Sequence, residues 1–325
     1  MRSIIHIVIF TSVLMGCGAF SYAQVVPQPL SLIASPSSPS PGQHYAVLAA
    51  TPTIDRYTAT FIWTVNGTPR PDFSGIGKNE ISLTAGSLGS ETRIAVSVRH
   101  AKGTSSTSLI IRVSDLALTW FAETYVPPWY RGKALPTQNT VVNIVAMPHI
   151  IVGGTLIPPE LLMYQWSFDS EADAYKGVDA RVFRIRTLDL PGATHTVRVA
   201  VEDLKGRVRK EGLIIIAPTA PRIALYATTP LGGVEPRSAR SSFSAQRGTL
   251  IDFQAEPFFF PVRSRRDLSY QWTVGGINVQ GQPENPSLLT INTGTRQGKT
   301  SIRVSVDDKQ EFIPSAAGLL NLLLQ

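Results

Sequence analysis

Three segments of the chain alternate strictly between apolar side chains and polar or small ones. They cover residues 94–98, 197–201 and 302–306, and each carries valine or isoleucine at every second position. A strand turns successive side chains to opposite faces, so this period of two predicts strands with one face buried and one face in water. Long stretches with the 3.6-residue period of helices are missing outside the N-terminus, which predicts an all-β protein.

A tryptophan lies upstream of each alternating segment, in nearly the same surroundings each time. Trp63, Trp166 and Trp272 follow an aromatic residue by two positions and precede valine or phenylalanine by two positions. They are 103 and 106 residues apart, and the central valine of the alternating segment comes 33, 33 and 32 residues later. In a β-sandwich a large aromatic side chain fills the space between the sheets, so we expect these tryptophans at the centres of three cores.

A third landmark completes the repeat. An apolar strand ends in Ala-x-Pro before each tryptophan, at Pro52, Pro148 and Pro257, and proline cannot donate to a strand ladder. About seven short strands in about 100 residues is typical of the immunoglobulin-like sandwich. The sequence therefore predicts three tandem immunoglobulin-like β-sandwich modules after an N-terminal signal peptide, at residues 27–114, 115–219 and 220–325. The apolar run at 319–324 is predicted to be the last strand.

The Tyr-x-Trp strands at residues 164–166 and 270–272, with their fixed distance to a Val-x-Val strand, resemble PKD-type and related immunoglobulin-like repeats. Such repeats occur in proteins of the bacterial cell surface or periplasm. The resemblance covers nearly the whole chain after the N-terminal segment, as a pattern of strands. It implies a protein built for structure or binding.

The N-terminus has the three parts of a secretory signal peptide. Arg2 gives a positively charged start, residues 4–14 form an apolar run, and Ser21-Tyr22-Ala23 offers a small-x-small cleavage site. The apolar run is too short to span a bilayer comfortably. We expect residues 1–23 to be removed and the protein to be exported to the periplasm or cell surface.

Cys17 is the only cysteine, and it has two interpretations. Residues 14–17, Leu-Met-Gly-Cys, resemble a bacterial lipobox, whose cysteine becomes the lipidated first residue; the alternative is a small residue within the signal peptide. A lipid anchor would be the only expected contact with a membrane. In either case the exported chain would have no disulfide, although its compartment would permit one. Animal extracellular immunoglobulin domains usually carry such bridges, so we favour a bacterial protein.

The formal net charge is +7, although charged residues make up only 16% of the chain. A basic exported protein can favour anionic partners, and arginines 263, 265 and 266 could form a basic patch. The alternative is a solvated loop and a charge that aids solubility. We expect partners among other envelope proteins or anionic and glycan polymers. We expect no nucleic acid, because no aromatic stacking platform accompanies the arginines.

The sequence offers no catalytic constellation and no cofactor motif. The five histidines are scattered, without a His-Glu-x-x-His pair, and there is no nucleophile elbow or phosphate-binding loop. Asp169, Glu171 and Asp173 follow the second tryptophan at a spacing that could offer oxygens to calcium. The competing interpretation is a solvated acidic loop, because the other two tryptophans have no such sequel.

Two apolar clusters are candidates for contacts. The first comprises Trp120, Tyr125, Trp129 and Tyr130. We expect it at the junction of modules one and two, and we favour packing between the modules over an exposed binding surface. The second comprises Phe258, Phe259 and Phe260. It is expected in a loop, where packing on a neighbouring module and a contact surface for a partner are both open.

These features predict an exported, non-enzymatic structural or binding protein whose tandem modules act as spacer, scaffold or adhesion units at the cell envelope. The alternative is an accessory carbohydrate-binding protein of an envelope enzyme system, which would hold glycan through surface aromatics such as Trp129 and Tyr130. Loss of glycan binding on Trp129→Ala would favour this alternative.

Overall fold

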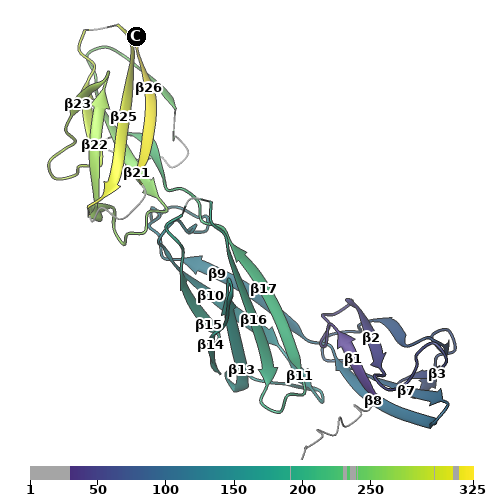
Figure 1. The fold of residues 1–325 in the computed structure, drawn as a ribbon. Helices are drawn as coiled ribbons and strands as arrows, with labels where there is room; N and C mark the ends of the chain where they lie inside the picture. Colours follow the sequence, from purple (N-terminus) through teal and green to yellow (C-terminus); the bar gives the residue numbers. More distant parts are fainter. Residues whose placement is uncertain are drawn as a thin grey trace, which may run out of the picture.

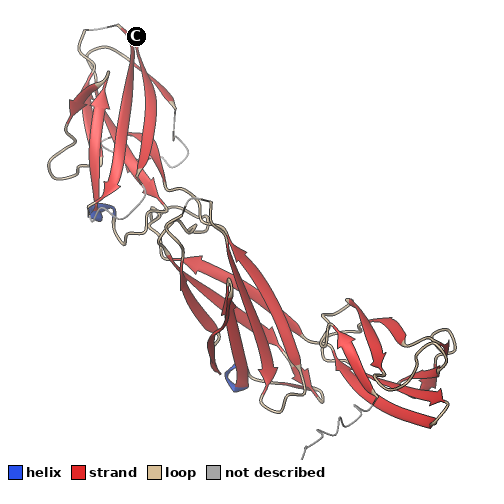
Figure 2. Cartoon of the chain, in the orientation of Figure 1, coloured by secondary structure: helices blue, strands red, loops and turns tan. Residues whose placement is uncertain are grey.

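The computed structural model describes residues 30–190, 192–229, 233–234, 239, 241–295, 297–309 and 315–325. Strands dominate these residues (Figure 2), and they form three β-sandwich modules joined end to end in an elongated molecule (Figure 1). The prediction of three tandem immunoglobulin-like sandwiches is confirmed. The predicted signal peptide and Cys17 lie outside the described residues. Within those residues, no helix is long and apolar enough to cross a membrane.

Module one consists of two antiparallel sheets. The first has the order β1-β2-β6 and contains β1 (Ser31–Ser35), β2 (His44–Ala50) and β6 (Glu80–Thr84). The second has the order β4-β3-β7-β8, with β5 also paired to β3. Its strands are β3 (Thr60–Val65), β4 (Thr68–Pro69), β5 (Gly75–Ile76), β7 (Glu91–His100) and β8 (Gly103–Arg112).

Module two repeats this arrangement. Its first sheet has the order β15-β10-β9 and contains β9 (Asp115–Ala122), β10 (Val141–His149) and β15 (Val182–Arg186). Its second sheet has the order β14-β13-β16-β17 and contains β13 (Leu162–Phe168), β14 (Glu171–Val178), β16 (His195–Asp203) and β17 (Arg209–Ile216). A hairpin of β11 (Ile151–Val152) and β12 (Thr155–Leu156) and a 3-10 turn (Pro159–Leu161) connect the two sheets.

Module three has larger sheets on the same plan. The first has the order β19-β18-β21-β24 and contains β18 (Arg222–Thr229), β19 (Gly233–Val234), β21 (Leu250–Phe258) and β24 (Leu288–Asn292). The second has the order β20-β26-β25-β22-β23 and contains β20 (Ser242–Ala245), β22 (Leu268–Val274), β23 (Ile277–Val279), β25 (Gly298–Asp308) and β26 (Ala316–Leu324). A 3-10 turn (Arg265–Asp267) precedes β22. The predicted last strand lies within β26.

The three tryptophans occupy the same place in the three modules. Each lies on the strand that pairs with the alternating one, and the Cα partners of the three tryptophans in the register are valines 96, 199 and 304. All three side chains are buried, each in the core of its own module. Each indole Nε1 donates to a backbone carbonyl 14 or 15 residues downstream, at Lys78, Ala180 and Pro286, over 2.7–2.9 Å. The repeat in the sequence is therefore a repeat of one packing solution.

Candidate functional site

The contact between modules two and three is an aromatic cluster. Its members, which we call the aromatic junction, are Trp129, Tyr130, Tyr226, Phe258 and Phe259. The Trp129 ring meets Tyr226 and Phe258 edge to face, with centroids 5.6 and 5.9 Å apart, and Tyr130 meets Phe258 and Phe259 at 5.4 and 5.9 Å. Edge-to-face pairs at such distances add about 0.5–1.5 kcal/mol each to the burial of the rings. The cluster therefore holds the two modules together.

Backbone hydrogen bonds fix the same junction. The Tyr125 amide donates to the Phe260 carbonyl, and the Phe259 amide donates to the Tyr125 carbonyl, both over 2.7 Å. Phe259 has φ +65°, a left-handed conformation that is uncommon for a bulky side chain. The Arg222 guanidinium lies 5.2 and 5.4 Å from the Phe258 and Phe259 ring centroids. Ring packing and backbone pairing together define one orientation of module three on module two.

The outer face of the β21 sheet is closed off beside this junction. Phe253 and Ala255 belong to the core of module three, so Gln254, Glu256 and Phe258 lie on the other face of the strand by alternation, yet they are only 3–4% exposed. Glu256 forms a 2.9 Å ion pair with Arg265. Burial raises the pKa of the Glu256 carboxyl, and the charge of Arg265 opposes the shift. Its Oε2 has no hydrogen-bond partner among the described residues.

The position of the first aromatic cluster corrects the sequence analysis. We expected Trp129 and Tyr130 at the junction of modules one and two, but their rings lie against module three. The reason is the length of β9: eight residues at roughly 3.3 Å each carry the chain from one end of module two to the other. Trp120, on β9, packs instead against the core of module two, and the Lys133 ammonium lies 3.4 Å from its ring centroid.

The Phe258 to Phe260 segment also differs from the expected loop. Phe258 is the last residue of β21, and all three side chains are at most 3% exposed. Phe258 and Phe259 pack on the rings of module two, whereas the Phe260 side chain belongs to the core of module three. Trp129 and Tyr130, which the carbohydrate-binding alternative named, are half-buried and contact these rings.

The contact between modules one and two is polar, and sequence reasoning missed it. We call it the polar junction; its centre is Lys210 on β17, only 8% exposed. The Lys210 ammonium donates to the Ser38 carbonyl at 2.9 Å and to the Ser40 hydroxyl at 2.8 Å. Burial lowers the pKa of Lys210, and the charge of Asp115 opposes the shift. The sequence did contain a signal for this burial. Lys210 lies on the same face of its strand as Gly212, Ile214 and Ile216, which is the face toward the core.

A second set of contacts flanks Lys210 at the polar junction. The Arg112 guanidinium donates to the Arg207 carbonyl at 3.0 Å and pairs with Glu91 at 2.8 Å. The same Glu91 carboxylate accepts a 3.4 Å hydrogen bond from the Gly153 amide of module two. Beside it, a β-carbon on Gly89 would lie 2.9 Å from methyl carbons of Ile151. Charge, hydrogen bonds and a close glycine contact thus replace aromatic packing here.

The acidic turn of module two has a structural role that needs no metal. Asp169 accepts hydrogen bonds from the His195 Nδ1 at 2.9 Å and from the Thr196 amide at 2.8 Å. The other His195 nitrogen accepts from the Leu188 amide, so this buried ring is held in its neutral tautomer. Asp173 is hydrogen-bonded by the Gln165 amide. Within the described residues no group of three potential ligands is placed to hold a metal ion, so the calcium expectation for Asp169, Glu171 and Asp173 finds no support.

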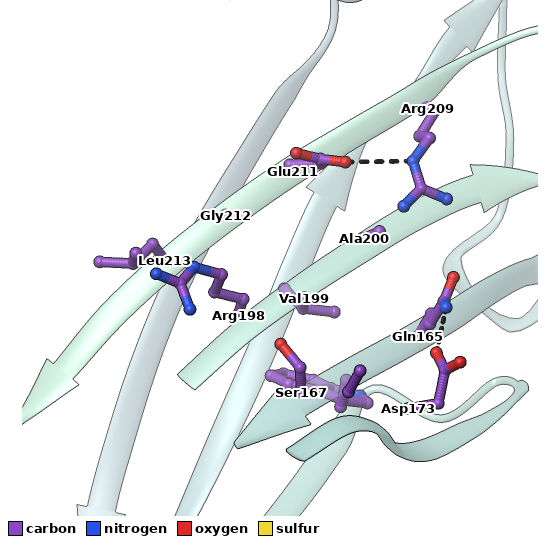
Figure 3. Close-up of a pocket in the computed structure, with 12 residues that line it drawn as sticks. Gln165, Ser167, Asp173, Arg198, Val199, Ala200, Arg209, Glu211, Gly212 and Leu213 are labelled. Carbon is purple, nitrogen blue, oxygen red and sulfur yellow. Dashed lines mark hydrogen bonds and ion pairs between the residues drawn. The ribbon is translucent and has the colours of Figure 1, made fainter. Parts of the chain in front are cut away.

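A shallow groove of about 430 Å³ lies on the second sheet of module two (Figure 3). Ser167, Val199 and Ala200 lie at its centre, with Gln165 and Asp173 on one side. Further lining residues include Arg198, Arg209, Glu211, Gly212 and Leu213. Arg209 is paired with Glu211 at 3.1 Å and with Glu202 at 3.3 Å. The groove is open, mixed in charge and without a nucleophile–base pair, so it suits binding better than catalysis.

Comparisons with known proteins find structural similarities at low sequence identity. No protein-family model matches the chain, and no curated protein matches its sequence. Among solved structures it is similar to the three N-terminal domains of the bacteriophage RB49 highly immunogenic outer capsid protein, at 13% identity and a TM-score of 0.25, over 91% of this chain and 98% of that one. It is also similar to a titin I-band fragment, at 10% identity and a TM-score of 0.22, over 91% and 97%.

A further similar structure is SGBP-B of the Bacteroides ovatus mixed-linkage glucan utilization locus, in complex with a mixed-linkage heptasaccharide. The identity is 11% and the TM-score 0.23, over 89% of this chain and 64% of that one. At such identities the similarity is one of fold alone.

Proposed function

We propose that the protein is an exported, non-enzymatic structural or binding protein of the bacterial cell envelope, whose three modules act as one spacer or scaffold. The observation that carries the proposal is that both junctions consist of direct contacts between modules. The PKD-type relationship remains part of the proposal and rests on the strand pattern around the tryptophans. The module boundaries at 114/115 and 219/220 are also part of the proposal.

The two junctions support a spacer because they restrict bending. Modules in one chain move relative to one another by default, unless their interface is substantial and apolar. Here aromatic rings and two backbone hydrogen bonds oppose bending at one junction, and the buried Lys210 opposes it at the other. A molecule of this form keeps its two ends at a constant separation. That property suits a protein that presents a binding surface at a distance from its attachment point.

Export is supported by the signal-like segment at residues 1–23. The test is fractionation of expressing bacteria, followed by mass determination of the N-terminus. We expect the protein in the envelope fractions, beginning at Gln24 or at a lipid-modified Cys17. An intact Met1 terminus on a cytoplasmic protein would overturn the proposal.

The spacer role has its own test in small-angle X-ray scattering. The purified protein should give a single elongated envelope whose maximum dimension matches the end-to-end arrangement of Figure 1. Trp129→Ala should broaden the distance distribution, because it removes the ring that bridges Tyr226 and Phe258. A wild-type protein that already scatters as freely jointed modules would contradict a spacer.

A further inference from the structure

Two modules carry the same pair of side chains on their open sheets. Arg198 on β16 is the register partner of Leu213 on β17, and Arg303 on β25 is the register partner of Leu319 on β26. Both arginines directly precede the valine that faces the core tryptophan, Val199 in module two and Val304 in module three. Since these valines are buried, alternation turns the arginines to the outer face.

A hydroxyl completes the arrangement on the neighbouring strand. Ser167 on β13 is the partner of Arg198, and Thr273 on β22 is the partner of Arg303. The open sheets of modules two and three therefore both present hydroxyl, guanidinium and leucine side by side across three strands. We call each such row a Ser/Thr-Arg-Leu row.

The arginines and leucines of these rows are exposed, whereas Ser167 and Thr273 are half-buried. Leu213 is 52% exposed and Leu319 is 59% exposed. Arg198 and Arg303 are exposed, and neither takes part in a hydrogen bond or ion pair within the described residues. Arg209 lies on the same strand, four residues before Leu213, and lines the same groove. By contrast, it forms ion pairs with Glu202 and Glu211.

Hollows in the surface accompany the rows. Arg198 and Leu213 line the groove of about 430 Å³ in module two (Figure 3). In module three a hollow of about 600 Å³ on β20, β25 and β26 begins two residues from the row, at Ser301 and Asn321, and contains Lys299. A bound chain could therefore settle against the row itself in module two, and in the hollow beside the row in module three.

Module one provides an internal comparison. Its residues at the same register positions are Thr64, Ala95 and Ser108, and the hollow of about 400 Å³ there has no charged lining residue. The strand β7 does carry exposed arginines. Arg99 faces Thr104, and Arg93 faces Ile110, which is half-buried. The full row is thus present in modules two and three and absent at the equivalent place in module one.

We propose that the Ser/Thr-Arg-Leu rows of modules two and three bind an anionic glycan polymer, a sugar chain that carries carboxylate or phosphate groups at intervals. The planar guanidinium binds either anion through two parallel hydrogen bonds. The leucine offers an apolar surface to the C–H face of a sugar ring, and the hydroxyl can hydrogen-bond a sugar oxygen. The inference deepens the proposed function, on which it rests, by naming the partner class of the spacer.

The repetition favours a polymer over a folded protein partner. One folded partner with one epitope needs one site, whereas a chain of repeating units can occupy equivalent sites on successive modules. Two weak sites on one molecule gain about 10²–10⁴-fold in avidity when a single chain reaches both. The positive net charge of the protein, +7 for the full sequence, agrees in sign with a polyanion.

Binding of the purified protein to three soluble polymers tests this inference. The probes are polygalacturonate, which carries carboxylates, a poly(glycerol phosphate), which carries phosphates, and neutral dextran. We expect binding to at least one polyanion, none to dextran, and weakening as salt rises. Preference between the two polyanions identifies the anion. Absence of binding to both, or equal binding to dextran, overturns the proposal and leaves a folded protein as the partner.

Variants separate the rows from net charge. Arg198→Ala and Arg303→Ala should each weaken polyanion binding about tenfold, and the double variant about a hundredfold. Leu213→Ser with Leu319→Ser should weaken it several-fold without changing charge. The matched control is Arg99→Ala, which removes an exposed arginine that faces Thr104 and should leave affinity unchanged. A double arginine variant that binds like wild type, or an Arg99→Ala variant that is equally weak, overturns the proposal.

The substituted side chains are exposed, so the variants should fold, and unchanged unfolding midpoints would establish this. Failure of these assays would leave fractionation and scattering untouched, since neither depends on glycan. Failure of export would instead remove the proposed function while the binding measurement stood.

Discussion

The two junctions use the same part of the fold but opposite chemistry. In both, the segment after the Ala-x-Pro strand meets the preceding module: Ile151 meets Gly89 at the polar junction, and Phe259 meets Tyr125 at the aromatic junction. Around this shared contact, one junction is completed by a buried lysine and the other by aromatic rings. The sandwich therefore fixes where modules meet, and the side chains at that place decide how firmly.

The difference has a physical consequence. Aromatic burial gains from the removal of apolar surface from water and does not depend on exact charge states. A buried ammonium depends on every hydrogen bond it makes, because an unpaired charge in the interior is costly. We therefore expect the aromatic junction to resist salt and pH more than the polar junction, apart from the buried Glu256 beside it. Four predictions examine this contrast, from the largest expected effect to the smallest.

Phe258→Ala should give the largest loss. It removes the ring that Trp129 and Tyr130 both contact, and truncation of a buried phenylalanine costs about 3–5 kcal/mol. Chemical unfolding of module three and scattering by the whole protein measure the two consequences. The control is Tyr57→Ala, at a side chain 70% exposed, which should stay within about 0.5 kcal/mol of wild type. Equal stability of the two variants would mean that Phe258 does not hold the junction.

Lys210→Ala should loosen the polar junction by about 1–3 kcal/mol, because it leaves the Ser38 carbonyl and Ser40 hydroxyl without their donor. Lys210→Met should cost less, since it keeps most of the volume and no longer buries a charge. Scattering should show bending between modules one and two in the alanine variant, with the aromatic junction intact. If methionine proved as harmful as alanine, the ammonium and not the packing would be the essential element.

The two buried charges predict opposite responses to pH. Glu256 has a pKa raised above its ordinary 4.5, so the folded state holds its proton more tightly and stability falls as pH rises above 4.5 through the folded value. Lys210 has a pKa lowered from 10.5, so stability rises as pH passes from the folded value toward 10.5. Urea unfolding of wild type between pH 4 and 10 should show both slopes.

Matched variants assign those slopes. Glu256→Gln should abolish the fall in stability above pH 4.5, and Lys210→Met should abolish the rise in stability toward pH 10.5. The groups that surround Glu256 are Arg265, whose charge opposes the shift, and the hydroxyls of Tyr125, Tyr226 and Tyr270. A slope that survived in the variant would belong to one of the other titrating groups.

The core of each module could be predicted from the sequence, because it follows from local periodicity. The alternating residues and the tryptophan spacing determine which side chains face inward, and a shift of one residue would expose them all. The register partners of Trp63, Trp166 and Trp272 are the valines that this spacing singles out.

The junctions could not be predicted in the same way. Lys210 and Ser38 are 172 residues apart, and no periodicity relates a lysine on β17 to a carbonyl before β2. The aromatic cluster was recognised as a cluster but assigned to the wrong end of module two, because the direction of β9 was not traced to its far end. Tyr226 was missed altogether, since its partner Trp129 lies on another module.

Glu91→Gln should give the smallest effect and the most direct measure of the contrast. It keeps the shape of the side chain but removes the charge that pairs with Arg112, and partly exposed ion pairs contribute about 0.2–1 kcal/mol. In wild type this contribution should fade at 1 M salt, where the Debye length is about 3 Å, so that wild type and variant converge. Trp129→Ala should keep its full cost at the same salt, because aromatic packing is not screened. If salt instead reduced the cost of both variants equally, the two junctions would not differ in kind, and the aromatic junction would owe its strength to Arg222 and the other charges around it.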